Sequence, residues 1–315
     1  MAVDIDSLIE LDKRALGKTV TVFEDSRASA IEQRRELLAQ LANHPQRRAG
    51  RFIGITGTPG SGKSTLIGEL ANRLVAADQS RAVAIVAVDP SSHISGGALL
   101  GDRTRVRFPP DERRLFFRSQ ASDRELGGVS RTTFQVCRLL HYLFDVVFVE
   151  TVGIGQSEIE IQQVADWVYL VLQPMGGDQI QFMKAGIMEI PDAFILNKCD
   201  EVDAARASYN ALRASLSLSR PGDSAEPTIH RTSAVNGDGL DAVVAEISAH
   251  DRGTRSMDDK ELYFFEKWVR DEFGRTGLRL LRDRASGGSA FVASAGSFDD
   301  AQLAFGTLVC DLTVE

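Results

Sequence analysis

The chain has 315 residues, which is long enough for one large domain or two smaller ones with a sizeable buried core. It carries 36 Lys and Arg against 44 Asp and Glu, and the net charge of −8 argues against a polyanion such as nucleic acid as the main partner. Its three cysteines, Cys137, Cys199 and Cys310, are far apart, which excludes a disulfide framework and a CxxC metal site.

The N-terminal residues contain acidic side chains where a secretion signal needs a basic start and an apolar stretch. No apolar run reaches the roughly 18 residues of a membrane-spanning helix. We therefore expect a soluble, cytoplasmic protein without membrane contact.

Residues 4–45 place apolar side chains at helical spacing among many charged ones. His44-Pro45 and the basic residues that follow end this pattern. The sequence therefore predicts a helical N-terminal arm over residues 1–50.

From residue 51 onward, short apolar runs alternate with helical patterns. Apolar runs without internal alternation are typical of strands that are buried on both faces. The order of strand and helix predicts an α/β domain over residues 51–252, with a mostly parallel sheet flanked by helices. The predicted strands cover residues 52–56, 82–88, 146–149, 168–172 and 194–196, with a further run at 228–232, and the predicted helices cover 63–77 and 129–143.

Residues 258–273 carry an apolar stripe at helical spacing that includes Phe265 and Trp268. We predict a C-terminal helical extension over residues 253–315, with a loop at 286–289. The stripe fits two arrangements, either packing on the sheet domain as core or pairing with a second copy of the chain. The sequence leaves both open.

A complete G-x-x-x-x-G-K-[ST] motif follows the first predicted strand and precedes the helix at 63–77, which is the context that a phosphate-binding loop requires. Glycines let backbone N–H groups close around phosphate oxygens, and the helix N-terminus adds its positive end. Lys63 is expected to reach the β- and γ-phosphates, and Ser64 offers a hydroxyl to Mg²⁺. The predicted nucleotide-binding residues here are Gly57, Pro59, Gly60, Ser61, Gly62, Lys63, Ser64 and Thr65.

The tetrapeptide Asn197-Lys198-Cys199-Asp200 follows another predicted strand and fits the N-K-x-D signature of guanine recognition. The Asp200 carboxylate can accept from guanine N1–H and from the exocyclic amine, whereas adenine has no N1–H. Ser233-Ala234 lie where a further guanine loop is expected, with a backbone N–H free for the base oxygen O6. Asn197, Lys198, Asp200, Ser233 and Ala234 are therefore predicted to bind the base.

Candidate Mg²⁺ and switch residues lie between these two motifs. Asp89 and Glu150 each end a predicted strand on the phosphate side of the sheet, where a carboxylate can hold Mg²⁺ or its waters. The N–H of Gly153 can contact the γ-phosphate, so that hydrolysis releases its loop. Asp102 is a further acid, although it also fits a local loop cap. Gln156 can orient the attacking water or cap a helix, and spacing does not decide between these roles.

Taken together, these motifs resemble the MeaB/ArgK/MMAA GTPases, a family of G-protein chaperones of adenosylcobalamin-dependent acyl-CoA mutases. The resemblance covers roughly residues 10–250 and extends beyond the generic phosphate loop. It is carried by the blocks 14–16, 54–65, 88–92, 95–103, 118–119, 126–131, 150–158, 177–178 and 184–190.

The resemblance implies a P-loop NTPase with a SIMIBI-type G domain, a slow homodimeric GTPase that uses GTP and Mg²⁺. Its nucleotide state would gate adenosylcobalamin loading and protect a mutase such as methylmalonyl-CoA mutase. By this likeness, Asp89, Asp102 and Glu150 join Ser64 around Mg²⁺. The catalytic set would then be Lys63, Asp102, Glu150, Gly153 and Gln156.

The stretch 173–184 resembles the third switch of the family, which faces the mutase. Family members usually carry Pro-Gly-x-Gly-Asp there, whereas this chain has Pro174-Met175-Gly176-Gly177-Asp178 followed by Phe182-Met183. None of these changes falls in the phosphate or base motifs. We therefore expect a client other than, or beside, methylmalonyl-CoA mutase, such as an isobutyryl-CoA or 2-hydroxyisobutyryl-CoA mutase.

Two other functions share this architecture. A kinase associated with arginine or ornithine transport would most simply use ATP, which the guanine signature at 197–200 disfavours. A nickel-insertion GTPase typically carries His-rich tracts or paired Cys and His ligands, and the five His and three Cys here are scattered.

Overall fold

The computed structural model describes residues 4–89, 106, 108–109, 111–121, 129–151, 157–174, 188, 190–219, 227–249, 256–284 and 286–313. The chain divides into two compact units. A helical unit combines Met1–Arg47, Arg131–Leu143 and Thr254–Glu315, and a sheet unit combines Arg48–Ser130 and Phe144–Gly253. Within the described ranges, no helix has the length and apolar character needed to cross a membrane.

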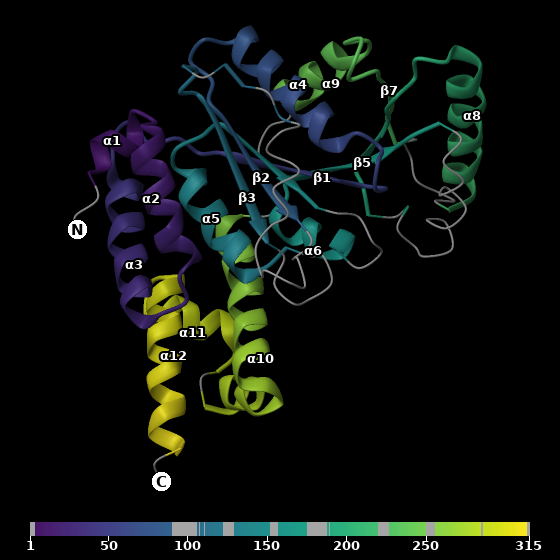
Figure 1. Cartoon of the computed structure of the whole chain (residues 1–315). Coiled ribbons are helices and arrows are strands. Elements are labelled where there is room, and N and C mark those ends of the chain that lie inside the picture. Colours follow the sequence, from purple (N-terminus) through teal and green to yellow (C-terminus); the bar gives the residue numbers. More distant parts are fainter. Residues whose placement is uncertain are drawn as a thin grey trace. The chain divides into compact units, whose positions relative to one another are not determined.

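The sheet unit contains a seven-stranded sheet in the order β3-β2-β4-β1-β5-β6-β7, in which every pairing is parallel (Figure 1). The predicted parallel α/β sheet is therefore confirmed. The strands are β1 (Arg51–Gly57), β2 (Val83–Asp89), β3 (Leu115–Ala121), β4 (Val146–Glu150), β5 (Trp167–Leu172), β6 (Ala193–Leu196) and β7 (Ile229–Arg231).

Strand β3 was missing from the predicted set because its sequence is not continuously apolar. Its second half contains Arg118, Ser119 and Gln120. Among the strands that the structure describes, it lies at the edge of the sheet and pairs with β2 alone, so one side of the strand needs no apolar neighbour.

Helices cover both faces of this sheet. α4 (Lys63–Ala77) and α9 (Leu240–Ala249) pack together on one face, against side chains such as Ile55 and Phe148, while α6 (Ser157–Val164) lies on the other (Figure 1). α8 (Val202–Ser219) packs against the alternate residues of β5 and β6. Gly54 lets α6 approach closely, because a Cβ at this position would lie 2.9 Å from Cδ1 of Ile161.

The helical unit is built from α1 (Ile5–Ile9), α2 (Lys13–Glu24), α3 (Ala28–Asn43), α5 (Arg131–His141), α10 (Met257–Arg284), α11 (Gly288–Ala295) and α12 (Phe298–Thr313). Asp12 caps α2 by accepting from the N–H groups of Arg14 at 3.1 Å and Ala15 at 2.8 Å. The C-terminal helices thus pack with the N-terminal helices and α5, an arrangement that neither sequence alternative contained.

A buried charge network links four of these helices. Arg138 of α5 is 5% exposed, and it donates to Glu261 at 2.7 Å and to Asp299 at 2.8 Å. Asp299 is 1% exposed and also pairs with Arg34 of α3 at 3.5 Å. The guanidinium of Arg138 lies 4.6 Å from the centre of the Phe298 ring. Because removing one partner would leave a buried charge uncompensated, this network favours a single arrangement of the helices.

Two predicted boundaries change. The predicted helix 258–273 continues as α10 to Arg284, with a break at Gly274, whose φ of 60° and ψ of −151° are not helical. The predicted loop 286–289 is wrong in its second half, because α11 begins at Gly288. α11 packs against α10 and α12, and this packing overrides the tendency of the glycines to form a turn.

Candidate functional site

The glycine-rich loop leaves β1 at Gly57 and enters α4 at Lys63, as the motif predicts. Two glycines are required by local geometry. Gly57 has φ of 144°, and a Cβ there would clash with the carbonyl oxygen of Val171. Gly62 has φ of 86°, and a Cβ there would lie 2.7 Å from Nδ2 of Asn197. The loop therefore packs tightly against neighbouring strand ends.

Lys63 folds back over this loop. Its Nζ donates to the carbonyl oxygens of Gly57 at 2.9 Å and Thr58 at 3.0 Å, and the residue is only 8% exposed. The hydroxyl of Ser61 also donates to the Thr58 carbonyl, at 2.9 Å. A buried ammonium group beside a helix N-terminus favours an anion, so this arrangement fits the phosphates of a nucleotide.

The hydroxyl of Thr58 gives a second indication of a ligand. Thr58 is 5% exposed, and its Oγ1 finds no hydrogen-bond partner among the described residues. A buried hydroxyl without a partner carries a desolvation cost that a bound polar group would offset. Thr58 thus fits a site that is completed by phosphate oxygens or by water.

The two predicted Mg²⁺ ligands that the structure describes in full lie together. Ser64 Oγ donates to Glu150 Oε1 at 2.8 Å, and both residues are buried. In the sheet register Glu150 pairs with Ala87 of β2, and Asp89 ends the same strand two residues further on. Hydroxyl and carboxylate oxygens are the ligands that a small, hard cation prefers.

These residues fit Mg²⁺ as part of a shared coordination shell. In the ranges that the structure covers, no group of three or more His, Cys, Asp or Glu could hold a metal ion. Mg²⁺ usually takes only one or two protein ligands and completes its shell with water and substrate phosphates. Ser64 and Glu150 therefore fit the protein's share of such a site.

Several predicted residues lie outside the described ones. These are Asp102, Gly153, Gln156, the side chain of Asp89, and most of the stretch 173–184. Their roles remain predictions.

The guanine signature is joined directly to the phosphate loop by Asn197. Its Nδ2 donates to the carbonyl oxygen of Ser61 at 2.8 Å, while its Oδ1 accepts from Thr232 Oγ1 and from the N–H of Ala234, both at 3.1 Å. Asn197 is 1% exposed. Its side chain therefore connects three loops, whereas the signature alone predicted base binding. Lys198 beside it has a positive φ of 63°.

The expectation of a free N–H at Ser233-Ala234 is wrong for this structure. Ser233 donates its N–H to Asp238 O at 3.0 Å, and Ala234 donates its N–H to Asn197. The reason is that a buried N–H needs an acceptor, and neighbouring groups of the same loop supply one. A base oxygen would have to compete with Asn197 for the Ala234 N–H.

Asp200 is held in a fixed orientation. Its Oδ1 accepts from the hydroxyl of Ser233 and from Nδ2 of Asn236, the latter at 3.1 Å. Asn236 also donates its N–H to Ser233 Oγ at 3.1 Å. Because Oδ1 is used twice, Oδ2 is the oxygen available for a base. Sequence reasoning missed Asn236, although Asn236-Gly237 is a strong turn signal directly after the predicted guanine loop.

Arg73 of α4 anchors this loop from the phosphate side. Its Nη2 donates to the Gly237 carbonyl at 3.1 Å, and its Nη1 pairs with Asp241. Sequence reasoning missed Arg73 as well, because it reads as an ordinary charged position of a surface helix. The helix that follows the phosphate loop is thus tied to the loop that orients Asp200.

Fold and site together define a P-loop GTPase. The phosphate loop, the Ser64–Glu150 pair and the guanine signature lie at the carboxyl ends of parallel strands, where open α/β sheets bind ligands. The family model described as methylmalonyl Co-A mutase-associated GTPase MeaB matches residues 16–268. The chain belongs to this family.

Relatives agree with this assignment. The chain is 41% identical over 219 residues to a Pyrococcus abyssi protein that is named as a GTPase, a match that spans 68% of this chain and 65% of the relative. It is 38% identical over 257 residues to a Caulobacter vibrioides protein named in the same way, with 79% and 77% covered. A mouse protein, methylmalonic aciduria type A homolog, mitochondrial, is 33% identical over 245 residues, with 74% and 59% covered.

Solved structures support the fold. A structure described as LAO/AO transport system kinase superposes with a TM-score of 0.61 at 23% identity, covering 90% of this chain and 86% of that one. HypB from Helicobacter pylori in complex with nickel gives a TM-score of 0.51 at 16% identity, covering 71% and 97%. At these identities the likeness concerns the fold alone.

Proposed function

We propose that the protein is a GTP-hydrolysing chaperone whose nucleotide state gates adenosylcobalamin loading and protects a B12-dependent acyl-CoA mutase. The observation that carries the nucleotide part is the Asn197–Ser61 hydrogen bond, which holds the base-recognition and phosphate loops together. The mutase part is supported by family membership, since the matching family model is described as associated with methylmalonyl-CoA mutase.

In this proposal each group has a defined task. Lys63 leaves the Gly57 and Thr58 carbonyls to bind the β- and γ-phosphates of GTP. Ser64 and Glu150 would hold Mg²⁺, which would supply positive charge to neutralise the phosphates. Asp200 Oδ2 accepts from the guanine edge.

Other residues complete the set. Asp89 and Asp102 are proposed to support the metal, Gly153 to contact the γ-phosphate and Gln156 to orient water. The stretch 173–184 is proposed to face the mutase, with a client such as methylmalonyl-CoA, isobutyryl-CoA or 2-hydroxyisobutyryl-CoA mutase.

We further infer a division of labour along the chain. Residues 51–252 carry the nucleotide chemistry, residues 1–50 form a helical arm, and residues 253–315 contribute to a homodimer. We place the protein in the cytoplasm. Light scattering of the whole chain tests the dimer, and a monomeric mass with and without GTP would contradict it.

The decisive experiment measures phosphate release from GTP by the purified chain, alone and with each cobalamin-dependent acyl-CoA mutase of the same organism. We expect one mutase to raise the rate several-fold, because docking reorganises the switch segments around the phosphates. If GTP is hydrolysed and no mutase changes the rate, the chaperone role fails while the GTPase assignment stands.

The same assay tests the transport-kinase alternative. A kinase that uses ATP would turn over ATP as well as GTP, whereas the Asp200 carboxylate disfavours adenine because adenine has no N1–H to donate. Equal use of ATP and GTP would contradict the guanine assignment.

A further inference from the structure

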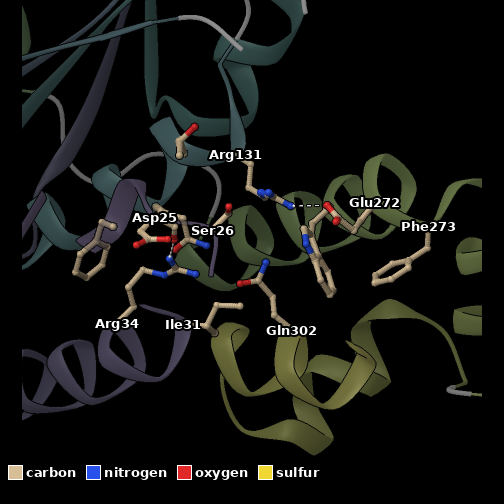
Figure 2. A pocket seen from close by; sticks show the side chains of 12 residues that line it. Asp25, Ser26, Ile31, Arg34, Arg131, Glu272, Phe273 and Gln302 are labelled. Carbon is tan, nitrogen blue, oxygen red and sulfur yellow. Dashed lines mark hydrogen bonds and ion pairs between the residues drawn. The ribbon is translucent and has the colours of Figure 1, made fainter. Parts of the chain in front are cut away.

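In the helical unit, a cavity of about 260 Å³ is lined by charged side chains that are already paired (Figure 2). Arg131 pairs with Glu272 at 3.4 Å. Arg34 pairs with the buried carboxylate of Asp299 at 3.5 Å. Since each of these charges has its counter-ion, the cavity identifies no ligand. The loop that connects β7 to α9, residues 232–239, is more informative, because one of its side chains acts on the carboxylate of the guanine signature. We call it the base loop.

The base loop holds the backbone of Asn236 in place. The N–H of Gly237 donates to the carbonyl oxygen of Ser233 at 2.8 Å, and the N–H of Ser233 donates to that of Asp238 at 3.0 Å. From α4, Nη2 of Arg73 donates to the Gly237 carbonyl at 3.1 Å. Gly237 has a φ of 83°, which L side chains rarely adopt. The side chain of Asn236 therefore projects from a backbone that is fixed on both sides.

Counting lone pairs shows what this side chain does to Asp200. Each oxygen of a carboxylate offers about two acceptor sites. Both sites of Asp200 Oδ1 are taken, one by the hydroxyl of Ser233 and one by Nδ2 of Asn236 at 3.1 Å. Oδ2 keeps its two sites, and guanine presents two adjacent donors, N1–H and the exocyclic amine. The two contacts on Oδ1 thus leave Oδ2 for the base.

The two neighbours of Asp200 differ in what they demand of it. The hydroxyl of Ser233 can donate or accept by rotating, so it suits either kind of partner. The NH₂ group of Asn236 can only donate, so it requires an acceptor on the atom that faces it. Asn236 is therefore the neighbour that determines which kind of atom at position 200 is left for the base.

We propose that Asn236 is a positioning residue for guanine recognition. Its NH₂ group holds Oδ1 of Asp200 and so directs the acceptor Oδ2 toward the base, without contact between Asn236 and the base itself. This inference rests on the proposed GTP-binding function and adds a specificity-determining position to it. It implies that the residue at position 236 decides which end of an amide at position 200 faces the base.

The first test removes the donor. Asn236→Ala frees Asp200 to turn, and we expect it to weaken GDP binding about 2- to 10-fold, the effect of one lost hydrogen bond. Fluorescence titration of the full chain with GDP that carries a fluorophore on the ribose measures the Kd, and the diphosphate avoids hydrolysis during the titration. Asn210→Ala changes an exposed asparagine of α8 and serves as the matched control, with an unchanged Kd expected.

The second test exchanges donor and acceptor. Asp200→Asn alone is expected to present its NH₂ group to the base and to prefer xanthosine diphosphate to GDP, because xanthine has a carbonyl where guanine has the amine. Adding Asn236→Asp places an acceptor beside the new amide, so that the NH₂ group turns to position 236 and the amide oxygen faces the base. We expect the double variant to regain GDP affinity about tenfold over Asp200→Asn and to lose the preference for xanthosine diphosphate.

A matched double variant separates this effect from added charge. Asp200→Asn with Asn210→Asp has the same net charge, but its new carboxylate lies on α8, in the third turn of the helix. We expect it to keep the preference for xanthosine diphosphate. A merely structural role for Asn236 would not reverse base preference, so the exchange reports on the orientation of the group at position 200.

The results that would overturn the proposal differ from those that would overturn the GTP-binding function. If Asp200→Asn prefers xanthosine diphosphate as expected and adding Asn236→Asp leaves that preference unchanged, Asn236 does not orient position 200. The same follows if folded Asn236→Ala binds GDP as tightly as the parent. If the parent binds no GDP, the GTP-binding function fails and the proposal fails with it. Thermal unfolding checks that the variants fold, and Asn236→Ala decides alone if the double variant does not.

Discussion

Replacing Asp200 by Asn turns one acceptor oxygen of the carboxylate into an NH₂ donor, while the side chain keeps its shape. In the parent protein, Oδ1 of Asp200 accepts from Ser233 and Asn236. Nδ2 of Asn236 can only donate, so the oxygen of the new amide retains that contact and its NH₂ group faces the base. Two donors then oppose guanine N1–H and its amine.

The expected loss follows from the bonds removed. Hydrogen bonds to a charged acceptor contribute about 1.5–3 kcal/mol each, so losing two weakens GTP binding by about 3–6 kcal/mol, or roughly 10²- to 10⁴-fold in Kd. Xanthine carries a carbonyl in place of the guanine amine. That carbonyl accepts from the new NH₂ group, so xanthosine triphosphate is expected to bind more tightly than GTP.

Competition with a fluorescent GDP analogue measures both affinities. Asp203→Asn is a matched control, because this substitution makes the same chemical change on α8, where the side chain of Asp203 is 92% exposed. GTP affinity unchanged in Asp200→Asn, with no gain for xanthosine triphosphate, would refute the assignment of Asp200 to the base. An equal loss in Asp203→Asn would refute its specificity.

Three other outcomes are expected. Lys63→Ala abolishes GTP binding or hydrolysis in a phosphate-release assay, and near-normal turnover would contradict the phosphate-loop assignment. Arg138→Met leaves Asp299 as a buried charge with a lost partner and lowers the free energy of unfolding by about 3–5 kcal/mol in urea, and an unchanged midpoint would show that the pair is not coupled to stability. Burial raises the pKa of the Cys137 thiol to about 12, so a thiol reagent at mildly alkaline pH labels exposed Cys310 in the native protein and spares Cys137, as mass spectrometry can verify.

Sequence patterns predicted the parts of the site that are formed by residues close together in the chain. The phosphate loop needs Gly57 and Gly62 for its backbone and Lys63 for charge, and all three belong to one short segment of the chain, residues 57–63. The helix at 63–77 was predicted with the bounds that α4 has, because its apolar positions recur at four-residue steps.

Contacts between distant segments were not predictable in this way. Asn236 donates to Asp200 because the loops that follow β6 and β7 meet, and Arg73 donates to Gly237 because α4 lies beside the second of these loops. Each residue alone is an ordinary polar residue. The N-terminal and C-terminal helices contact one another through the ion pair between Arg34 and Asp299, which are 265 residues apart. No periodicity in either helix encodes that pairing.

That separation also has a consequence during synthesis. At about 5–20 residues per second, Asp299 leaves the ribosome on the order of 10–50 s after Arg34, whose buried charge has no counter-ion from α12 until then. The N-terminal helices are made first, and their core cannot be completed until α12 has been made. Each new molecule therefore passes through an interval in which its N-terminal helices expose apolar surface, and a stop codon before α12 would make that interval permanent.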